Sequence, residues 1–232
     1  NVFSCAKGSP GLAIGNIIGS STMNILLILG VSALVWPIDV SRVSVRRDIP
    51  VGFVATLAIT LMANYFFTEQ AHTINWIEGI VLLMMGVGYL LLTILKKDPQ
   101  EESEETQQVM PWGKTILSLL FGVGGLYLGG ELVSNNAQIL ARNWGMSEST
   151  IGLTVVATAT SLPELITSIV AALKKNSAIA IGNVLGSNIM NIFMVLGISA
   201  LITPLPFEPI MNKQLMILFA ANILMLLFVF TG

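Results

Sequence analysis

The segment Thr158–Glu164, which reads Thr-Ala-Thr-Ser-Leu-Pro-Glu, holds the groups of this chain best suited to chemistry. Glu164 lies near the middle of the apolar run 149–173. A charged side chain at that depth in a bilayer costs on the order of 3 kcal/mol and needs a partner. No Lys, Arg or His lies at a comparable depth in the sequence, so we expect the partner of Glu164 to be a bound cation or a proton.

Pro163 adds backbone oxygens to this segment. Proline has no N–H, so the carbonyl of Ala159 loses its helical hydrogen bond and the turn opens. We expect the carbonyls from Ala157 to Thr160 to become available as ligands, together with the hydroxyls of Thr160 and Ser161. A site made only of oxygen atoms suits hard cations such as Ca²⁺ or Na⁺. The alternative is a proline kink beside a structural glutamate that carries a proton.

Two further stripes of polar side chains recur at helical spacing in runs that are otherwise apolar. Each stripe has an Asn, a Ser and an Asn at i, i+4 and i+8: Asn16, Ser20, Asn24 and Asn183, Ser187, Asn191. In lipid, such a stripe faces protein or a water-filled cavity. We expect the shallower Asn16 and Asn183 to join helices through amide hydrogen bonds. The deeper residues are the better ligand candidates: Ser20, Asn24, Ser187 and Asn191.

The composition requires that membrane helices position these groups. Of the 232 residues, 54% are hydrophobic and 10% are charged, and the mean hydropathy is +0.81. Soluble domains are about 25% charged. This excludes a soluble enzyme and a disordered protein. The 11 basic against 13 acidic residues provide no positive surface for nucleic acid.

Membrane spans need about 20 apolar residues. The sequence predicts an all-α polytopic bundle with seven such runs: 12–36, 50–67, 77–95, 115–138, 149–173, 179–202 and 215–230. The loops at 37–49, 96–114 and 174–178 then lie on one side and hold eight of the 11 Lys and Arg residues. The positive-inside rule makes that side cytoplasmic. We therefore expect an integral protein of the cell inner or plasma membrane.

An internal repeat relates two of these runs. Ala13–Pro37 and Ala180–Pro204 align without a gap at an offset of 167 and share 15 of 25 residues. The two copies enter the membrane from opposite sides, because five spans separate equivalent points. Inverted repeats are typical of secondary transporters, whose ion site lies near the midplane. A duplication kept only for packing is the alternative, but the shared residues include the polar ones.

These motifs resemble those of the sodium/calcium exchangers, within the cation/Ca²⁺ exchanger superfamily. The resemblance rests on Thr-Ser-Leu-Pro-Glu at 160–164, on Gly-Asn-Val-Leu-Gly-Ser-Asn-Ile at 182–189 and on Ala13–Pro37, which resembles the later half of a first α-repeat. It implies a ten-span fold and a prokaryotic-type exchanger. It also implies that Glu164 is one of two Ca²⁺-binding carboxylates. The further ligands or neighbours implied are Ala157, Thr160, Ser161, Ser187, Asn191, Ser20 and Asn24.

Two positions depart from the family pattern. Asn191 stands where several members carry Asp, which lowers the negative charge of the site and leaves the Na⁺ stoichiometry and any K⁺ co-transport open. Ser21-Thr22 replaces the usual Asn-Ile, which we expect to alter packing more than binding.

The repeat also predicts how the chain is organised. Residues 1–97 form a first inverted repeat, 98–111 an acidic cytoplasmic linker and 112–232 a second repeat. Subtracting the offset from Ser161–Glu164 gives positions before Asn1, and the counterpart of Ile77–Leu95 would begin near 244. We therefore expect a partner Leu-Pro-Glu motif and a tenth span outside this sequence, with each repeat shortened at its outer end.

Together these observations predict an antiporter that exchanges Ca²⁺ for Na⁺ by alternating access, and not an enzyme. H⁺/Ca²⁺ exchange is the first alternative, because Glu164 could carry the proton, and a cation channel is the second. An intramembrane enzyme is disfavoured, since no span pairs Ser with His or two Asp residues. We expect no cofactor. The partners are the lipid bilayer and inorganic cations, a monomer is expected to suffice, and the oligomeric state is open.

Overall fold

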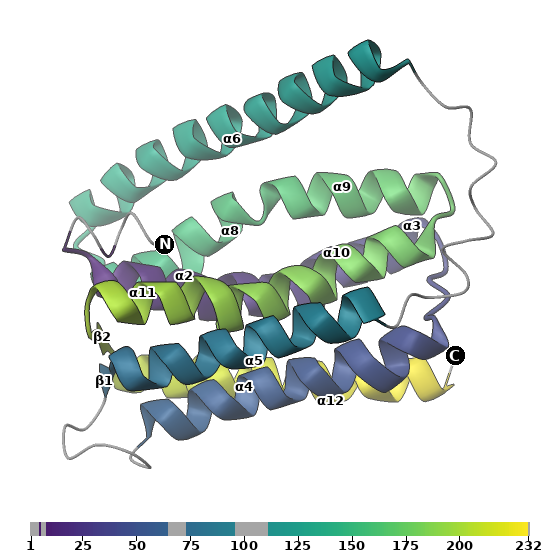
Figure 1. Ribbon diagram of the computed structural model, residues 1–232. Helices are drawn as coiled ribbons and strands as arrows, with labels where there is room; N and C mark the ends of the chain where they lie inside the picture. Colours follow the sequence, from purple (N-terminus) through teal and green to yellow (C-terminus); the bar gives the residue numbers. More distant parts are fainter. Residues whose placement is uncertain (1–4, 6–7, 65–72, 96–110, 232) are drawn as a thin grey trace.

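The computed structural model describes residues 5, 8–64, 73–95 and 111–231, which form a bundle of helices lying side by side (Figure 1). The first half contains α2 (Pro10–Met23), η1 (Asn24–Leu29), α3 (Gly30–Val35), η2 (Ser44–Asp48), α4 (Ile49–Ala63), β1 (Thr73–Ile74) and α5 (Trp76–Leu95). The second half contains α6 (Trp112–Asn143), α7 (Glu148–Ile151), η4 (Gly152–Val156), α8 (Ala157–Thr160), α9 (Leu162–Leu173), α10 (Ser177–Met190), η5 (Asn191–Leu196), α11 (Gly197–Ile202), β2 (Leu205–Pro206) and α12 (Pro209–Thr231). The segments labelled η are π-helical. The prediction of an all-α bundle is confirmed.

Five helical stretches in the described part of the chain are long and apolar enough to cross a membrane. They are Pro10–Val35, Trp76–Leu95, Ser149–Leu173, Ser177–Ile202 and Ile210–Phe230. Each coincides with a predicted span to within a few residues. The other two predicted spans also form helices, because 50–67 falls mostly in α4 and 115–138 falls inside α6. Residues 65–67 and 98–110 of the predicted segments lie outside the described residues.

Two contacts join loops at opposite ends of the bundle. β1 pairs with β2 in an antiparallel ladder, which joins the segments before α5 and before α12 at one face of the bundle. At the opposite face, the Lys175 Nζ lies 4.3 Å from the centroid of the Trp36 ring, in a cation–π contact between the ends of α9 and α3. Both contacts join loops that the span order assigns to the same side.

The two copies of the repeat fold alike. The helix α2–η1–α3 and the helix α10–η5–α11 have the same internal bounds at the offset of 167, including a π-helical segment that begins at Asn24 in one and at Asn191 in the other. Figure 1 shows them running in opposite directions, with α3 at one end of the bundle and α11 at the other. The local sequence therefore sets the same helix breaks twice.

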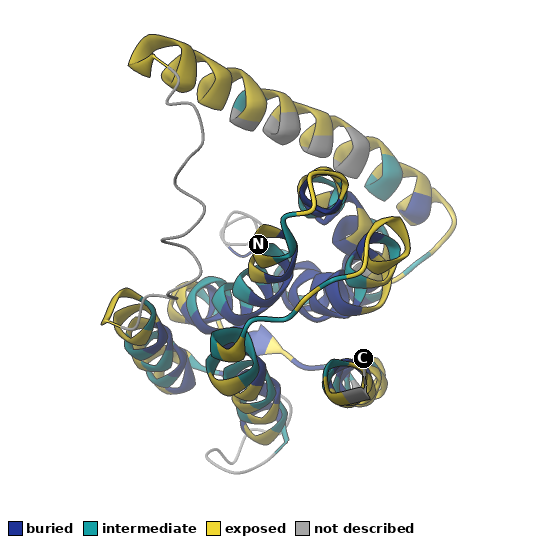
Figure 2. Cartoon of the chain, turned by 90° about the vertical axis from the view of Figure 1, so that its right-hand side faces the viewer, coloured by how far each residue is buried: buried dark blue, intermediate teal, exposed yellow. Residues whose placement is uncertain are grey.

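Buried residues concentrate on the central helices α2, η1, α10 and η5, as the dark segments in Figure 2 show. α6 lies apart along one side and is exposed over most of its length. Its described contacts are with α7, η4, α8 and α9. Of the predicted site residues, Ser20, Asn24, Ala157 and Ser161 are buried. Glu164, Ser187 and Asn191 are partly buried, and Thr160 is exposed.

Candidate cation-binding site

The helix that carries Glu164 breaks just before Pro163, as the sequence predicts. α8 ends at Thr160, Ser161 has φ −89° and ψ −3°, and α9 begins at Leu162 with Pro163 in its first turn. The Ser161 N–H still donates to the Ala157 carbonyl at 3.1 Å, so that oxygen keeps only one lone pair for a ligand. The Ala159 carbonyl has no i+4 donor, because that position is Pro163.

Glu164 lies in the first turn of α9, where the helix dipole favours negative charge. Its Oε2 is buried and accepts no hydrogen bond from the described residues. Its backbone carbonyl accepts a hydrogen bond from Asn183 Nδ2 at 3.0 Å, and the same amide donates to Ser168 Oγ at 2.9 Å. Asn183 therefore joins α10 to α9, which agrees with the packing role expected for the shallow asparagines.

Thr160 joins α8 to α2. Its Oγ1 lies 2.8 Å from Asn16 Oδ1, 2.8 Å from the Val156 carbonyl and 3.3 Å from the Ala157 carbonyl. One hydroxyl hydrogen serves only one of these acceptors at a time, so only one of the three contacts is a full hydrogen bond at any moment. The neighbouring Ser161 Oγ is buried and has no hydrogen-bond partner among the described residues.

Asn24 joins the two repeats. Its Nδ2 donates to Ser187 Oγ at 3.1 Å and to Asn188 Oδ1 at 2.8 Å. The amide of Asn188 in turn donates to the Ser21 carbonyl at 3.1 Å, across the offset of 167. Both hydrogens of the Asn24 amide are used, while its Oδ1 is buried and accepts no hydrogen bond from the described residues. The hydrogen bonds of Asn24 thus hold its amide in place and leave its carbonyl oxygen free.

The other three candidates keep oxygen lone pairs. Ser20 Oγ donates to the Ile17 carbonyl at 3.2 Å, and Ser187 Oγ donates to the Val184 carbonyl at 3.1 Å. The half-buried side chain of Asn191 makes no hydrogen bond with the described residues. Asn24 and Asn191 each begin a π-helical segment, a helix variant that is frequent at functional sites.

The structure brings the candidates into two hydrogen-bonded groups, Asn24 with Ser187 and Thr160 with the Ala157 carbonyl. α9 packs against η1, α3 and α10, which brings the helix of Glu164 to those of Asn24 and Ser187. No described contact joins the Glu164 carboxylate to Ser20, Ser187 or Asn191. Within the described residues no group of three or more His, Cys, Asp and Glu side chains forms a metal cluster. The oxygens here are therefore mostly neutral.

Sequence reasoning missed Asn188. It is buried, and its two side-chain ends bridge the two copies of the repeat. Its counterpart in the first copy is Ser21, so Asn188 does not belong to the polar pattern that the two copies share.

Six buried side-chain oxygens lack a hydrogen-bond partner among the described residues, and three of them belong to the candidate site: Asn24 Oδ1, Ser161 Oγ and Glu164 Oε2. Buried polar groups without partners are rare in folded proteins and call for an explanation. All three are acceptors or can act as acceptors, and they come from η1 and from the break between α8 and α9. Their chemistry fits a hard cation better than it fits an anion or an apolar ligand.

Comparison with known proteins gives matches over almost the whole chain. Residues 1–95 and 114–232 match the family described as sodium/calcium exchanger protein. The inner membrane protein YrbG of Escherichia coli is 37% identical over 210 residues, which are 86% of this chain and 62% of that protein. The chain thus spans less than two thirds of the length of this relative.

Two exchangers are similar over most of this chain. The sodium/calcium exchanger MaX1 of Methanosarcina acetivorans is 25% identical over an alignment of 271 residues, gaps included, which covers 100% of this chain and 77% of that protein. A structure of the sodium-calcium exchanger NCX_Mj soaked with Na⁺ and Sr²⁺ is 32% identical with a TM-score of 0.75, and the match covers 98% of this chain and 72% of that one.

Proposed function

The chain belongs to the sodium/calcium exchanger family. We propose that it forms part of a secondary antiporter that exchanges Ca²⁺ for Na⁺ by alternating access. The observation that carries the proposal is the set of three buried oxygens without donors, Asn24 Oδ1, Ser161 Oγ and Glu164 Oε2. The exchange named for MaX1 and NCX_Mj supports it.

We infer that the transported ions bind where α9 meets η1 and α10. Glu164 supplies the negative charge, and Ser161, Thr160 and the Ala157 carbonyl supply oxygens from the same helix break. Asn24, Ser20, Ser187 and Asn191 supply neutral oxygens from the repeat helices. Ca²⁺ takes six to eight oxygen ligands. A site with one carboxylate and several neutral oxygens offers ligands to either ion, so we expect Ca²⁺ and Na⁺ to compete for them.

Competition for shared ligands gives exchange a physical basis. If both ions use Glu164, occupancy by one excludes the other, and the site returns across the membrane only when it is loaded. The π-helical segments at Asn24 and Asn191 place irregular backbone next to the ligands, where a small rearrangement changes access. H⁺/Ca²⁺ exchange is the second candidate, because the buried Glu164 carboxyl could also carry a proton.

The arrangement in the membrane remains part of this proposal. The loops at 37–49, 96–114 and 174–178 face the cytoplasm, and residues 1–97 and 112–232 act as two inverted halves joined by the acidic linker 98–111. The shared ends of α3 and α9 agree with the first and third of these loops lying on one side.

Glu164→Gln tests the proposed site. The protein is expressed in cells, everted membrane vesicles are prepared, and Ca²⁺ uptake driven by a Na⁺ gradient is measured. We expect Glu164→Gln to abolish uptake, because the amide keeps the shape of the side chain and removes its charge. Glu131→Gln is the matched control, since Glu131 is exposed on α6 and its variant should transport normally. Unchanged uptake by Glu164→Gln would exclude this site.

Replacing the Na⁺ gradient with a pH gradient separates the two antiport reactions. Uptake that follows only the Na⁺ gradient supports Na⁺ coupling, and uptake that follows only the pH gradient supports H⁺ coupling. Ca²⁺ flux that proceeds down its own gradient without either counter-ion would instead indicate a channel.

A further inference from the structure

A small polar cavity lies where α2, α4, α10 and α12 meet, and the proposed ion site does not include it. Its volume is about 10 Å³, measured as the space open to the centre of a water-sized sphere. One polar side chain from each helix lines it: Ser21, Thr56, Asn188 and Asn222, all of them buried. The lining contains no charged side chain. Such a cavity is polar, neutral and about the size of one water molecule.

The Asn222 amide has one group in the cavity lining without a described hydrogen-bond partner. Its side chain is 3% exposed, and its Nδ2 donates to the Leu218 carbonyl at 2.8 Å within α12. Its Oδ1 accepts no hydrogen bond from the described residues. A buried amide oxygen without a donor costs about 1–3 kcal/mol. This oxygen therefore requires a hydrogen-bond donor inside the cavity.

The other lining groups offer both lone pairs and hydrogens. The Thr56 hydroxyl donates to the Gly52 carbonyl at 2.9 Å, so its oxygen faces the remaining space with lone pairs only. The Asn188 amide uses one hydrogen for the Ser21 carbonyl, and its second hydrogen has no described acceptor. A guest that both donates and accepts hydrogen bonds satisfies this set. A cation would meet the amide hydrogen and no carboxylate.

We propose that this cavity binds one water molecule. The water donates to Asn222 Oδ1 and to the Thr56 hydroxyl oxygen, and it accepts a hydrogen bond from the Asn188 amide. Buried waters typically make about three hydrogen bonds to groups that lack partners. Since Asn188 Oδ1 also accepts from Asn24, the water links α4 and α12 to the asparagine that bridges the two repeats. The proposal does not depend on which ions are exchanged.

Gly52→Ala distinguishes a filled cavity from an empty one. Gly52 lines the cavity, and a Cβ at this position would meet only Asn222 Oδ1, at 3.8 Å, which is an ordinary contact. In an empty cavity the methyl group fits, and the gain in helix propensity raises the melting temperature. If a water is present, the methyl group displaces it and leaves Asn222 Oδ1 without a donor. We expect the melting temperature to fall.

Gly88→Ala is the matched control for the melting experiment. Gly88 lies inside α5, and a Cβ there would meet no atom within 4 Å. We expect this variant to melt slightly higher than the wild type. A rise for Gly52→Ala of the same size as for Gly88→Ala would overturn the proposal.

A high-resolution structure of the unmodified protein tests the same site without a variant, and it decides if Gly52→Ala does not fold. We expect a single density peak at O–H···O distance, about 2.5–3.0 Å, from Asn222 Oδ1 and Thr56 Oγ1. No peak would overturn the proposal. A peak that disappears when Na⁺ is replaced by choline would also overturn it, because the guest would then be a cation.

Discussion

The helices α2–η1–α3 and α10–η5–α11 belong to repeats that share 15 of 25 residues, and they have the same internal breaks, yet their surroundings differ. In the first, Gly15 and Gly19 lie against the neighbouring helix: a Cβ on Gly15 would be 2.7 Å from the Ser149 carbonyl oxygen, and one on Gly19 would be 2.7 Å from Ala157 Cβ. In the second, the equivalent Gly182 and Gly186 have no atom within 4 Å of a Cβ. A shared small-residue motif therefore makes a close helix contact in only one copy.

The equivalent asparagines Asn24 and Asn191 also differ in the partners that they meet. Asn24 donates to Ser187 and to Asn188, the residues that follow each other in the second copy. By symmetry Asn191 would donate to Ser20 and to residue 21. Residue 21 is serine, which has no amide oxygen, and Asn191 makes no hydrogen bond with the described residues. The exchange of one residue type thus leaves one asparagine held and the other free to bind a ligand.

Local sequence therefore determines the helix and its π-helical break, whereas the neighbours determine what each polar or small residue does. Predictions that change equivalent residues in the two copies therefore test the structure better than single substitutions do. The largest difference is expected for the glycines, because backbone atoms cannot move away as side chains can.

Gly19→Ala and Gly186→Ala should differ most. The methyl group on Gly19 would overlap the Leu153 carbonyl and Ala157, so α2 must separate from η4. We expect unfolding to become easier by about 3 kcal/mol. Gly186→Ala should be neutral or raise stability by up to about 1 kcal/mol through helix propensity. Thermal unfolding of the purified 232-residue chain in detergent measures both. Equal losses would mean that a further helix also covers Gly186.

Asn24→Ala and Asn191→Ala should separate stability from transport. Removing Asn24 leaves Asn188 Oδ1 without its donor, and we expect a loss of about 2 kcal/mol. Asn191→Ala removes no hydrogen bond within the described residues, so stability should change by less than about 0.5 kcal/mol. Ca²⁺ uptake should nevertheless fall, because a proposed ligand is lost. An Asn191→Ala variant that transports normally would show that Asn191 is not a ligand.

Much of this arrangement could be predicted from the sequence. Hydropathy placed the span 149–173 at the bounds observed, and the gapless repeat gave the second helix from the first. Pro163 predicted the break at Ser161, because a missing N–H is a local property. The polar stripes identified Asn24 and Ser187, which the structure joins.

Other features leave no mark in the pattern of apolar and polar residues. A π-helical turn differs from an α-helical one only in hydrogen bonding to residue i−5 instead of i−4, so the segments at Asn24 and Asn191 were not predicted although both copies form them. The ladder of β1 and β2 has two residues in each strand, too few for an alternating pattern. Asn188 was missed because its importance comes from the partners that it meets in the other copy.

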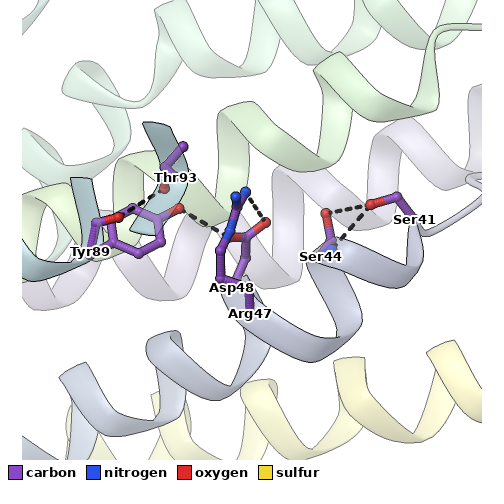
Figure 3. A network of polar contacts seen from close by, with 6 residues as sticks. All are labelled: Ser41, Ser44, Arg47, Asp48, Tyr89 and Thr93. Atoms are coloured by element: carbon purple, nitrogen blue, oxygen red, sulfur yellow. Dashed lines mark hydrogen bonds and ion pairs between the residues drawn. The ribbon is translucent and has the colours of Figure 1, made fainter. Parts of the chain in front are cut away.

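A polar contact at the start of α4 has no counterpart in the other half. Asp48 is buried, pairs with the Arg47 Nε at 2.7 Å and accepts a hydrogen bond from the Tyr89 hydroxyl at 3.2 Å (Figure 3). At the offset of 167 the equivalent residue in α12 is Leu215, which is buried in the apolar core. The link between α4 and α5 therefore depends on a charge that the second half lacks.

Tyr89→Phe should weaken this link without opening a cavity. We expect a loss of about 1.5 kcal/mol, the lower range for a hydrogen bond to a charged group, because Asp48 keeps its pair with Arg47. Thr93→Val is the control, since the Thr93 hydroxyl donates only to the Tyr89 carbonyl of its own helix (Figure 3). Its effect on thermal unfolding should be smaller. Equal effects of the two variants would show that the bond to Asp48 contributes little.

Gly30→Ala and Gly197→Ala test the smallest expected difference, about three turns further along the repeat helices than Gly19 and Gly186. α5 covers Gly197, where a Cβ would lie 2.9 Å from Leu83 Cγ and 3.0 Å from the Gly79 carbonyl oxygen. Gly30 meets no atom within 4 Å and lines a largely apolar cavity of about 730 Å³ between η1, α10 and α12. We expect Gly30→Ala to gain up to about 1 kcal/mol and Gly197→Ala to lose stability.

The sign of the change in stability for Gly30→Ala shows whether lipid or protein covers this position in the membrane. Lipid chains yield to a methyl group, so the helix propensity of alanine should dominate if lipid fills this cavity. If Gly30→Ala instead unfolds more easily than the wild type, as Gly197→Ala should, a helix covers Gly30 as α5 covers Gly197. Repeating the melts in lipid nanodiscs and in detergent separates the two cases, because only a lipid-filled face should respond to the change of solvent.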